Sequence, residues 1–160
     1  MQNKIFEYTQ LDRLKDQIKV KKVVLVGGSF DLMHYGHVTF LKNAKKEGDI
    51  LIVALESDDF SKRKKKKVPV HNQQQRAEIL ACLHMVDYVL KLPLFENHSD
   101  YFNLVKSINP SVIAVTEGDT MIEKKQEQAK AIGATVKTVC PRLEKFSSSN
   151  IASYEKIFSD

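Results

Sequence analysis

The sequence has few of the features that mark secreted, membrane-bound or metal-stapled proteins. Its 160 residues include two cysteines, Cys82 and Cys140, which stand far apart and without a CxxC spacing. This usage predicts neither a zinc site nor a disulfide framework. No apolar run approaches the roughly 20 residues needed to cross a bilayer, and the first ten residues lack the basic start and apolar core of a secretory signal. We therefore expect a cytoplasmic protein with no membrane partner.

Internal repeats and linkers are also lacking, so we interpret residues 1–160 as one domain. Residues 1–20 are expected to form an N-terminal helical extension, because Leu11, Leu14 and Ile18 recur at helical spacing. The net charge of +5 favours anionic partners, either nucleic acid or small phosphorylated molecules. Composition alone does not choose between these two classes of partner.

Short apolar runs alternate with helical patterns along the rest of the chain. The predicted strands are residues 23–26, 50–55, 86–92, 112–115 and 135–139, and the predicted helices are residues 36–47, 73–83, 99–108, 121–132 and 149–158. Several of the strands are apolar throughout, which is typical of a parallel sheet buried on both sides. The pattern therefore predicts an α/β fold: a Rossmann-like, doubly wound, five-stranded and mostly parallel sheet with helices on both faces. Such sheets bind ligands outside the carboxyl ends of their strands.

The stretch GGSFDLMHYGH, residues 27–37, leaves the first of these strands and enters a helix. Its leading glycines allow backbone N–H groups to approach a phosphate closely. It matches neither GxGxxG nor GxxxxGK[ST], so the dinucleotide and Walker motifs are excluded. His34 and His37 would share one face of the first helical turn, where two imidazoles can donate hydrogen bonds to phosphoryl oxygens. From spacing alone, capping or packing histidines and a metal-binding pair remain alternatives.

The run G-S-F-D-L-M-H-Y-G-H resembles the G-x-F-D-x-x-H-x-G-H signature of the cytidylyltransferase-like nucleotidyltransferases. The matched fixed positions are Gly28, Phe30, Asp31, His34, Gly36 and His37. Enzymes of this family transfer a nucleotide from CTP or ATP to a phosphorylated acceptor and release pyrophosphate. The later run PRLEKFSSSNI, residues 141–151, is similar to the R-T-E-G-I-S-T-T-K-I motif of glycerol-3-phosphate cytidylyltransferases and to the S-T-T-N-I ending of the adenylyltransferase domain of ADP-heptose synthases.

The resemblance implies roles for particular residues at the carboxyl edge of the sheet. It implies that four side chains act on the reacting phosphates, namely His34, His37, Lys64 and Arg142. It implies that a second set binds the nucleotide, namely Gly28, Ser29, Phe30, Asp31, Gly36, Lys66, Arg76, Gly118, Asp119, Ser147, Ser148 and Ser149. Mg²⁺ is expected to enter with the nucleoside triphosphate, held by substrate and water rather than by a protein ligand set. The resemblance also implies a homodimer.

The basic block from Lys62 to Lys67 follows the second predicted strand. Taken alone, such a block is a solvated face, a nucleic-acid patch or a targeting signal. Its position after a strand instead predicts a mobile flap aimed at the triphosphate, whose lysines neutralise pyrophosphate or bind the acceptor. We predict that Lys64 and Lys66 are the acting lysines, and we do not expect a nucleic-acid partner.

The expected reaction transfers CMP or AMP to a phosphorylated sugar or polyol, of the glycerol 3-phosphate or heptose phosphate type, for envelope or glycan precursors. Lys145 replaces the family's glycine before the serine run, and Glu117 stands where the heptose enzymes have glycine, so the acceptor stays open. An adenylyltransferase of the FAD synthetase type and a nucleotide-binding regulator without turnover are the alternatives. The choice between CTP and ATP is also open.

Overall fold

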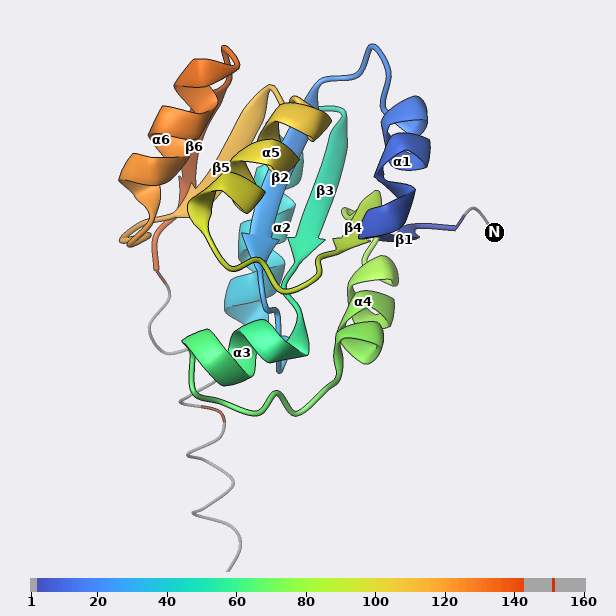
Figure 1. Ribbon diagram of the computed structural model, residues 1–160, viewed down its shortest axis with the longest axis vertical. Coiled ribbons are helices and arrows are strands. Elements are labelled where there is room, and N and C mark those ends of the chain that lie inside the picture. The colour runs from blue at the N-terminus through green and yellow to red at the C-terminus, as the bar shows by residue number, and fades with distance from the viewer. Residues whose placement is uncertain (1–2, 143–150, 152–160) are drawn as a thin grey trace, which may run out of the picture.

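The computed structural model describes residues 3–142 and residue 151. Its six strands are β1 (Ile5–Glu7), β2 (Val23–Gly28), β3 (Ile50–Leu55), β4 (Tyr88–Lys91), β5 (Val112–Thr116) and β6 (Thr135–Cys140). They form one sheet in the order β1-β4-β3-β2-β5-β6, and every neighbouring pair is parallel (Figure 1). The predicted α/β fold with a parallel sheet is confirmed, but the predicted number of five strands was wrong.

The additional strand is β1, which lies inside the segment predicted to be helical. Its three residues pair with β4, with Phe6 opposite Leu90. Three residues are too few to show a strand period, so this strand exists because β4 offers it a free edge. The helical part of the extension begins only after the 3-10 turn η1 (Tyr8–Gln10), as α1 (Leu11–Gln17).

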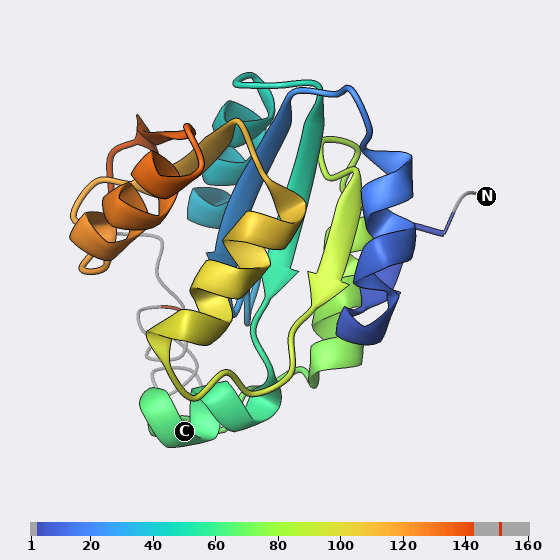
Figure 2. The same cartoon turned by 45° about the horizontal axis from the view of Figure 1, so that its top comes forward.

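Helices cover both faces of the sheet, as predicted. On one face α2 (Tyr35–Lys45) and α4 (Gln73–Ala81) bury Phe40, Leu41 and Leu80 against the strands. On the other face α1, α5 (His98–Ile108) and α6 (Ile122–Ala131) form a second apolar core around the even positions of β3, Ile52 and Ala54. Figure 2 shows α1, α5 and α6 in front of the sheet, with α2 and α4 behind it.

The basic segment after β3 is not the loop that was predicted. Residues 58–64 form a further helix, α3 (Asp58–Lys64), and Ser57 caps it by accepting a hydrogen bond from the backbone N–H of Phe60 at 3.1 Å. Asp58 and Asp59 lie in its first turn, and Lys62, Arg63 and Lys64 in its last. This arrangement complements the helix dipole, so the charge run stabilises a helix in spite of its loop-like composition.

The strand order places β2 between β3 and β5. From β2 the chain adds β3 and β4 on one side and then β5 and β6 on the other, so the strand order switches sides at β2. In doubly wound sheets this switch point is where ligands bind, at the carboxyl ends of the strands. Those ends lie at the bottom of Figure 1, beside α3. Within the described part of the chain, no helix has the length and apolar character required of a membrane span.

Candidate active site

The turn between β2 and α2 has an unusual backbone. Phe30 and Leu32 adopt φ of 47° and 49°, and Lys66 in the nearby basic segment has φ of 51°. Non-glycine residues with positive φ are costly and concentrate at binding sites. Of the five non-glycine residues with positive φ in the described chain, three lie in this one region.

Gly28 has no side chain because the ring of Phe30 occupies that place. A Cβ on Gly28 would lie 2.9 Å from Cε2 of Phe30, closer than two carbons approach. Phe30 is buried, and its ring centroid lies 5.2 Å from that of His37. The glycine thus lets Phe30 fold beneath the turn and support the second histidine.

His34 and His37 are brought together as predicted. Their rings stack with centroids 3.7 Å apart and planes 20° from parallel. His34 is the N-cap of α2, and its Nδ1 accepts a hydrogen bond from the backbone N–H of His37 at 3.4 Å. Because that nitrogen accepts, the neutral imidazole of His34 carries its proton on Nε2, which leaves an N–H donor beside the helix N-terminus. Gly36 is the second residue of the same helix.

Both imidazoles are held in the neutral form. Burial lowers the pKa of His34. The pKa of His37 falls to about 4, chiefly because of burial and further because a protonated His37 would be repelled by the ammonium of Lys65 and by His34 whenever that ring is protonated. Neutral histidines remain hydrogen-bond donors through one N–H each, while the positive charge near the turn comes from elsewhere.

Asp31 connects the turn to the segment after the basic block. Its two carboxylate oxygens accept hydrogen bonds from the backbone N–H groups of Val70 at 2.9 Å and His71 at 3.1 Å. These bonds join residues about 40 positions apart in the chain. Asp31 therefore fixes how the segment after α3 returns toward the β2–α2 turn.

Arg76, which was predicted to bind the nucleotide, lies buried beneath the turn, with 1% of its surface exposed. Its guanidinium donates to the carbonyl oxygens of His71, Ser29 and Glu56. It also forms an ion pair with Asp58 at 2.6 Å. These bonds tie together the ends of β2 and β3 and the starts of α3 and α4, so the guanidinium positions the site from below.

Lys65 is the basic-block residue whose ammonium group turns inward. Its Nζ donates to Oγ of the buried Ser29 at 3.0 Å and lies 5.9 Å from the Phe60 ring centroid. The side chain as a whole is exposed, but its charged end is partly enclosed, and this desolvation lowers the pKa of Lys65. The lysines predicted to act are Lys64 and Lys66 instead. Both are exposed and make no ion pair with another described residue, so their roles remain predictions.

Glu56 and Tyr101 were not singled out from sequence. Glu56 follows the apolar strand β3, is buried to 7% exposure, and accepts a hydrogen bond from the Tyr101 hydroxyl at 2.9 Å. Its other oxygen, Oε2, has no hydrogen-bond partner among residues 3–142. Burial of its carboxyl group raises the pKa of Glu56. Burial of the Tyr101 hydroxyl and the neighbouring Glu56 carboxylate raise the pKa of Tyr101. The signal was available, because Glu56 is the first charged residue after an uninterrupted apolar strand.

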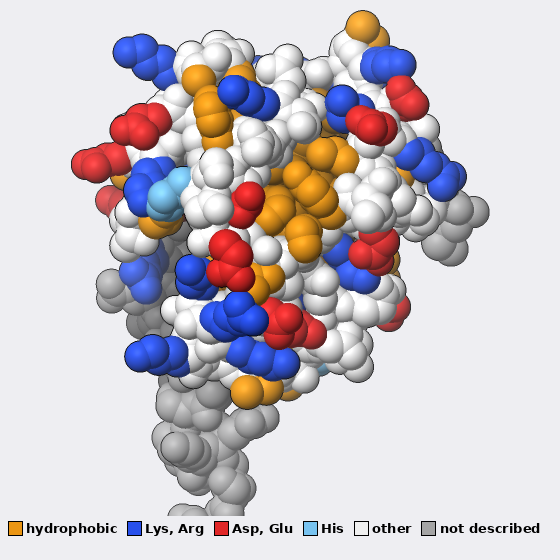
Figure 3. Space-filling model, in the orientation of Figure 1, with side chains coloured by type: hydrophobic (Ala, Val, Ile, Leu, Met, Phe, Trp, Pro, Cys, Tyr) orange, Lys and Arg blue, Asp and Glu red, His pale blue; other side chains and the backbone are white. Residues whose placement is uncertain are grey.

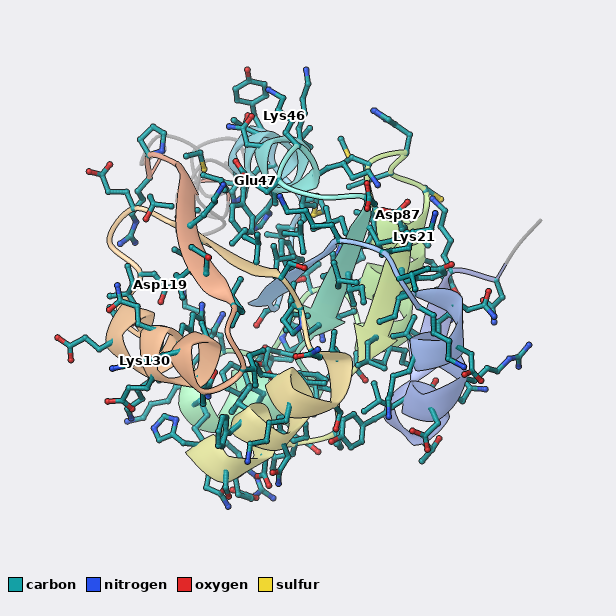
Figure 4. The ribbon with its side chains drawn as sticks, turned by 90° about the horizontal axis from the view of Figure 1, so that it is seen from above. Lys21, Lys46, Glu47, Asp87, Asp119 and Lys130 are labelled. Carbon is teal, nitrogen blue, oxygen red and sulfur yellow. The ribbon has the colours of Figure 1, made fainter. Side chains whose placement is uncertain are left out.

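On the other side of β2, Gly118 and Asp119 form the turn after β5. Gly118 has φ of 73°, which favours glycine. Asp119 accepts a hydrogen bond from the backbone N–H of Met121 at 2.8 Å and forms an ion pair with Lys125 of α6 at 2.6 Å. Figure 4 labels Asp119 beside α6. Arg142 is exposed and lies two residues beyond β6.

The predicted residues Ser147, Ser148 and Ser149, and the predicted final helix, lie outside the described residues. Figure 3 shows Lys and Arg side chains gathered over α3 near the carboxyl edge. The described site thus combines a strained turn, two neutral histidines at a helix N-terminus and an inward lysine. A Rossmann-like sheet with such a turn and helix N-terminus at its switch point is typical of the nucleotide-binding class of α/β proteins.

The family is established by sequence comparison. Residues 25–154 match the model of the family described as cytidylyltransferase-like. The chain belongs to this cytidylyltransferase-like family, so the predicted family is confirmed, and the expected enzyme class of nucleotidyltransferase agrees with it.

Two curated relatives illustrate the range of the family. An FAD synthase of Thermococcus sibiricus is 38% identical over 122 residues, which cover 74% of this chain and 80% of the relative. The bifunctional protein HldE of Aliarcobacter butzleri is 44% identical over 100 residues, which cover 62% of this chain and 20% of that protein. The chain therefore spans about a fifth of the length of the bifunctional relative.

Solved structures agree with this placement. The lipopolysaccharide core biosynthesis protein from Thermoplasma volcanium superimposes with a TM-score of 0.62 at 27% identity, covering 75% of this chain and 95% of that one. A pantoate-beta-alanine ligase from Francisella tularensis reaches a TM-score of 0.65 over 98% of this chain and 78% of its own, at 19% identity. The second likeness concerns the fold alone.

Proposed function

We propose that this chain transfers AMP from ATP to the phosphate group of a small sugar or polyol phosphate and releases pyrophosphate, with CTP as the alternative donor. The product would be an activated precursor for the cell envelope or a glycan. The observation that carries the proposal is the stacked pair of neutral histidines at the N-terminus of α2. The resemblance to an FAD synthase favours ATP, because FAD contains an adenylate.

The reaction needs little covalent participation by the protein. An oxygen of the acceptor phosphate attacks the α-phosphorus, a new P–O bond forms, and the bond from the α-phosphorus to the oxygen leading to the β-phosphorus breaks. Negative charge grows on the equatorial oxygens of the α-phosphoryl group and on the departing pyrophosphate. Catalysis then consists mainly of positioning the reactants and of donors aimed at that charge.

His34 and His37 are suited to donate to the α-phosphoryl oxygens. Because both are neutral, each can donate an N–H without repelling Mg²⁺ or losing a proton to the phosphate. The helix dipole at the N-terminus of α2 would add to the stabilisation. In this proposal Lys65 supplies positive charge toward the leaving phosphates, with Lys64, Lys66 and Arg142 as further candidates.

Mg²⁺ would accompany the triphosphate and neutralise part of its charge. In residues 3–142 and at residue 151, no group of three or more His, Cys, Asp or Glu side chains could hold a metal ion. The proposal accordingly keeps the metal on the phosphates and on water, in the manner of metals that enter a site with a nucleotide. The homodimer also stays part of the proposal.

The two sides of β2 would take different parts of the substrates. We place the nucleoside over β5, where Gly118 and Asp119 form the turn, and the acceptor over β3. The two substrates meet at the α-phosphorus, which would lie between these sides at the end of β2. Ser147, Ser148 and Ser149 remain candidates for the β- and γ-phosphates.

The test is pyrophosphate release from ATP and CTP, each with glycerol 3-phosphate, a heptose 1-phosphate or FMN as the acceptor. Wild-type protein is compared with His37→Ala and with His84→Ala, an exposed histidine outside the site. We expect one pair to release pyrophosphate in wild type and His84→Ala, with His37→Ala far slower. Turnover of FMN would instead establish the FAD synthetase alternative. Binding of a nucleotide without turnover of any pair would favour the regulator.

The nucleobase can be assigned separately by thermal unfolding with ATP or CTP in the presence of Mg²⁺. A ligand that binds only the folded state raises stability by RT ln(1 + [L]/Kd). We expect the larger shift with ATP. A larger shift with CTP would move the proposal to cytidylyl transfer.

A further inference from the structure

Glu56 stands out because its buried carboxylate is only half satisfied. Oε1 accepts a hydrogen bond from the Tyr101 hydroxyl at 2.9 Å, whereas Oε2 is enclosed and has no hydrogen-bond partner in the described part of the chain. A buried polar group without a partner costs about 1–3 kcal/mol, and more when charged. Such a group therefore calls for an explanation beyond packing.

Two explanations conflict with the geometry. A substrate does not reach Oε2 in this arrangement, because the atom is closed off from solvent. Glu56 also forms no ion pair within the described chain that would make it a stabilising partner. What remains is the negative charge of its carboxylate, which interacts electrostatically with three cations: Lys65, Arg76 and Lys125.

Of these cations, Lys65 depends most on Glu56. The Arg76 guanidinium already bonds Asp58, and Lys125 bonds Asp119, so each has a carboxylate of its own at 2.6 Å. The ammonium of Lys65 has a neutral hydroxyl, Ser29 Oγ, as its hydrogen-bond partner among the described residues. A desolvated ammonium with only a neutral partner needs a negative charge nearby to remain ionised.

The backbone brings Glu56 to the right place. Gly28 and Leu55 are paired across β2 and β3, so Ser29 and Glu56 follow at neighbouring positions. The Glu56 N–H donates to the Gly28 carbonyl at 3.0 Å, and Arg76 holds the carbonyl groups of both Ser29 and Glu56. Tyr101 then fixes the carboxylate from the α5 side.

We propose that Glu56 is a positioning residue, whose buried carboxylate keeps the Lys65 ammonium charged and turned inward over Ser29, where it meets the leaving phosphates. The role of Lys65 toward phosphates rests on the proposed function, but the coupling of Glu56 to Lys65 does not. Four charged groups face Lys65 besides the histidines. Glu56 and Asp31 favour its charged form, whereas Arg76 and Lys67 oppose it.

The direct test is the pKa of Lys65, measured by NMR of the ¹⁵N-labelled lysine ammonium groups and assigned with Lys65→Arg. Since Glu56 favours the charged form, Glu56→Gln should lower the Lys65 pKa by about one unit, as expected for loss of an opposite charge within several ångströms. The matched control is Glu96→Gln, which removes an exposed carboxylate paired with Arg63 of α3, the helix that Lys65 caps. This change should leave the Lys65 pKa unchanged.

A second readout is the binding of magnesium pyrophosphate between pH 7 and 10. In Glu56→Gln the loss of affinity at alkaline pH should begin about one pH unit lower than in wild type. The double variant Glu56→Gln with Lys65→Arg should bind without this early loss, because arginine stays charged at these pH values. A purely structural role of Glu56 would not be rescued by that second change.

The outcomes separate the two proposals. A lowered Lys65 pKa in Glu56→Gln supports the coupling even if wild-type protein releases no pyrophosphate from any substrate pair. An unchanged Lys65 pKa overturns it even if the enzyme is active. Should Glu56→Gln fail to fold, Glu56→Met supplies an uncharged side chain of similar length for the same measurement. Failure of both variants to fold would overturn the proposal, because Glu56 would then be structural.

Discussion

The two ends of the parallel strands, called here the amino edge and the carboxyl edge of the sheet, differ in how completely their polar groups are paired. At the amino edge, Oδ2 of Asp87 accepts from Nζ of Lys45 at 2.6 Å and from the Leu51 N–H at 2.7 Å. The Lys22 N–H donates to Asp49 at 2.9 Å in the same region. Figure 4 looks onto this edge and labels Asp87, Lys21, Lys46 and Glu47 there.

At the carboxyl edge, several buried polar atoms are left without a hydrogen-bond partner. Within the described residues, all three buried side-chain atoms that lack a hydrogen-bond partner lie there: Nδ1 of His37, Oε2 of Glu56 and Nδ1 of His71. Phe30 and Leu32 add backbone strain at the same edge. One sheet thus has an edge whose polar groups are paired and an edge that keeps unpaired polar groups and backbone strain, a combination that is common at functional sites.

The largest expected effect on this comparison is loss of turnover at the carboxyl edge. His37→Ala removes one donor to the transition state and should lower kcat about 100- to 1,000-fold, corresponding to about 2.7–4 kcal/mol. The same change should leave urea unfolding near that of wild type at pH 7.5. Steady-state pyrophosphate release measures the first quantity. Equal turnover in wild type and His37→Ala would remove the histidine pair from the mechanism.

The amino edge should show the reverse pattern. Asp87→Ala leaves the Leu51 N–H without its acceptor and should lower the free energy of unfolding by about 1–3 kcal/mol. The kcat should stay close to wild type, because Asp87 lies at the far end of the strands. Asp87→Asn is the control, since it retains an acceptor for that N–H. A loss of turnover without a loss of stability would break the contrast between the edges.

The pH dependence of stability tests the burial of His37. Its pKa is 6.5 when unperturbed and about 4 in the folded protein. As pH falls from 6.5 toward 4, the unfolded chain binds a proton that the folded chain does not, so the free energy of unfolding decreases. In His37→Gln this decrease should be smaller by about 1–3 kcal/mol. Urea unfolding at pH 7 and pH 4.5 gives both values, and identical slopes would contradict a buried neutral His37.

The smallest expected effect concerns the scaffold of the carboxyl edge. Ser57→Ala removes the N-cap of α3 and should lower the free energy of unfolding by about 1 kcal/mol. Ser57→Asp, which can still accept the hydrogen bond from Phe60, should remain close to wild type. Thermal and urea unfolding of the three proteins would measure this. No difference between alanine and aspartate would mean that the basic segment gains nothing from its cap.

The regular part of the fold was predictable from sequence because its elements are long and strongly patterned. Strands such as β3 are apolar from end to end, and the alternation with helices fixed the parallel arrangement. The strand β1 was missed because three residues carry no period and depend on pairing with β4. The helix α3 was missed because its lysines resembled a loop, although Ser57 and two aspartates were cap signals.

The site was predictable in its motif and less so in its surroundings. Glycine spacing and helix period sufficed to bring His34 and His37 together. Which lysine turns inward depends on where α3 ends, and that end falls at Lys65, its C-cap. Oε1 of Glu56 is paired with Tyr101 of α5, which lies 45 positions away in the chain. A local sequence pattern cannot predict such a contact.

The most direct test of the central claim follows the two ends of the triphosphate separately. Wild-type protein is incubated with ATP labelled at either the α- or the γ-phosphorus, Mg²⁺ and the acceptor that gives turnover. If the carboxyl edge transfers a nucleotide, the α-label should appear in the acceptor product and the γ-label in pyrophosphate, with both signals lost in His37→Ala. Appearance of the γ-label in the acceptor, or of the α-label in free ADP, would contradict nucleotidyl transfer at this site.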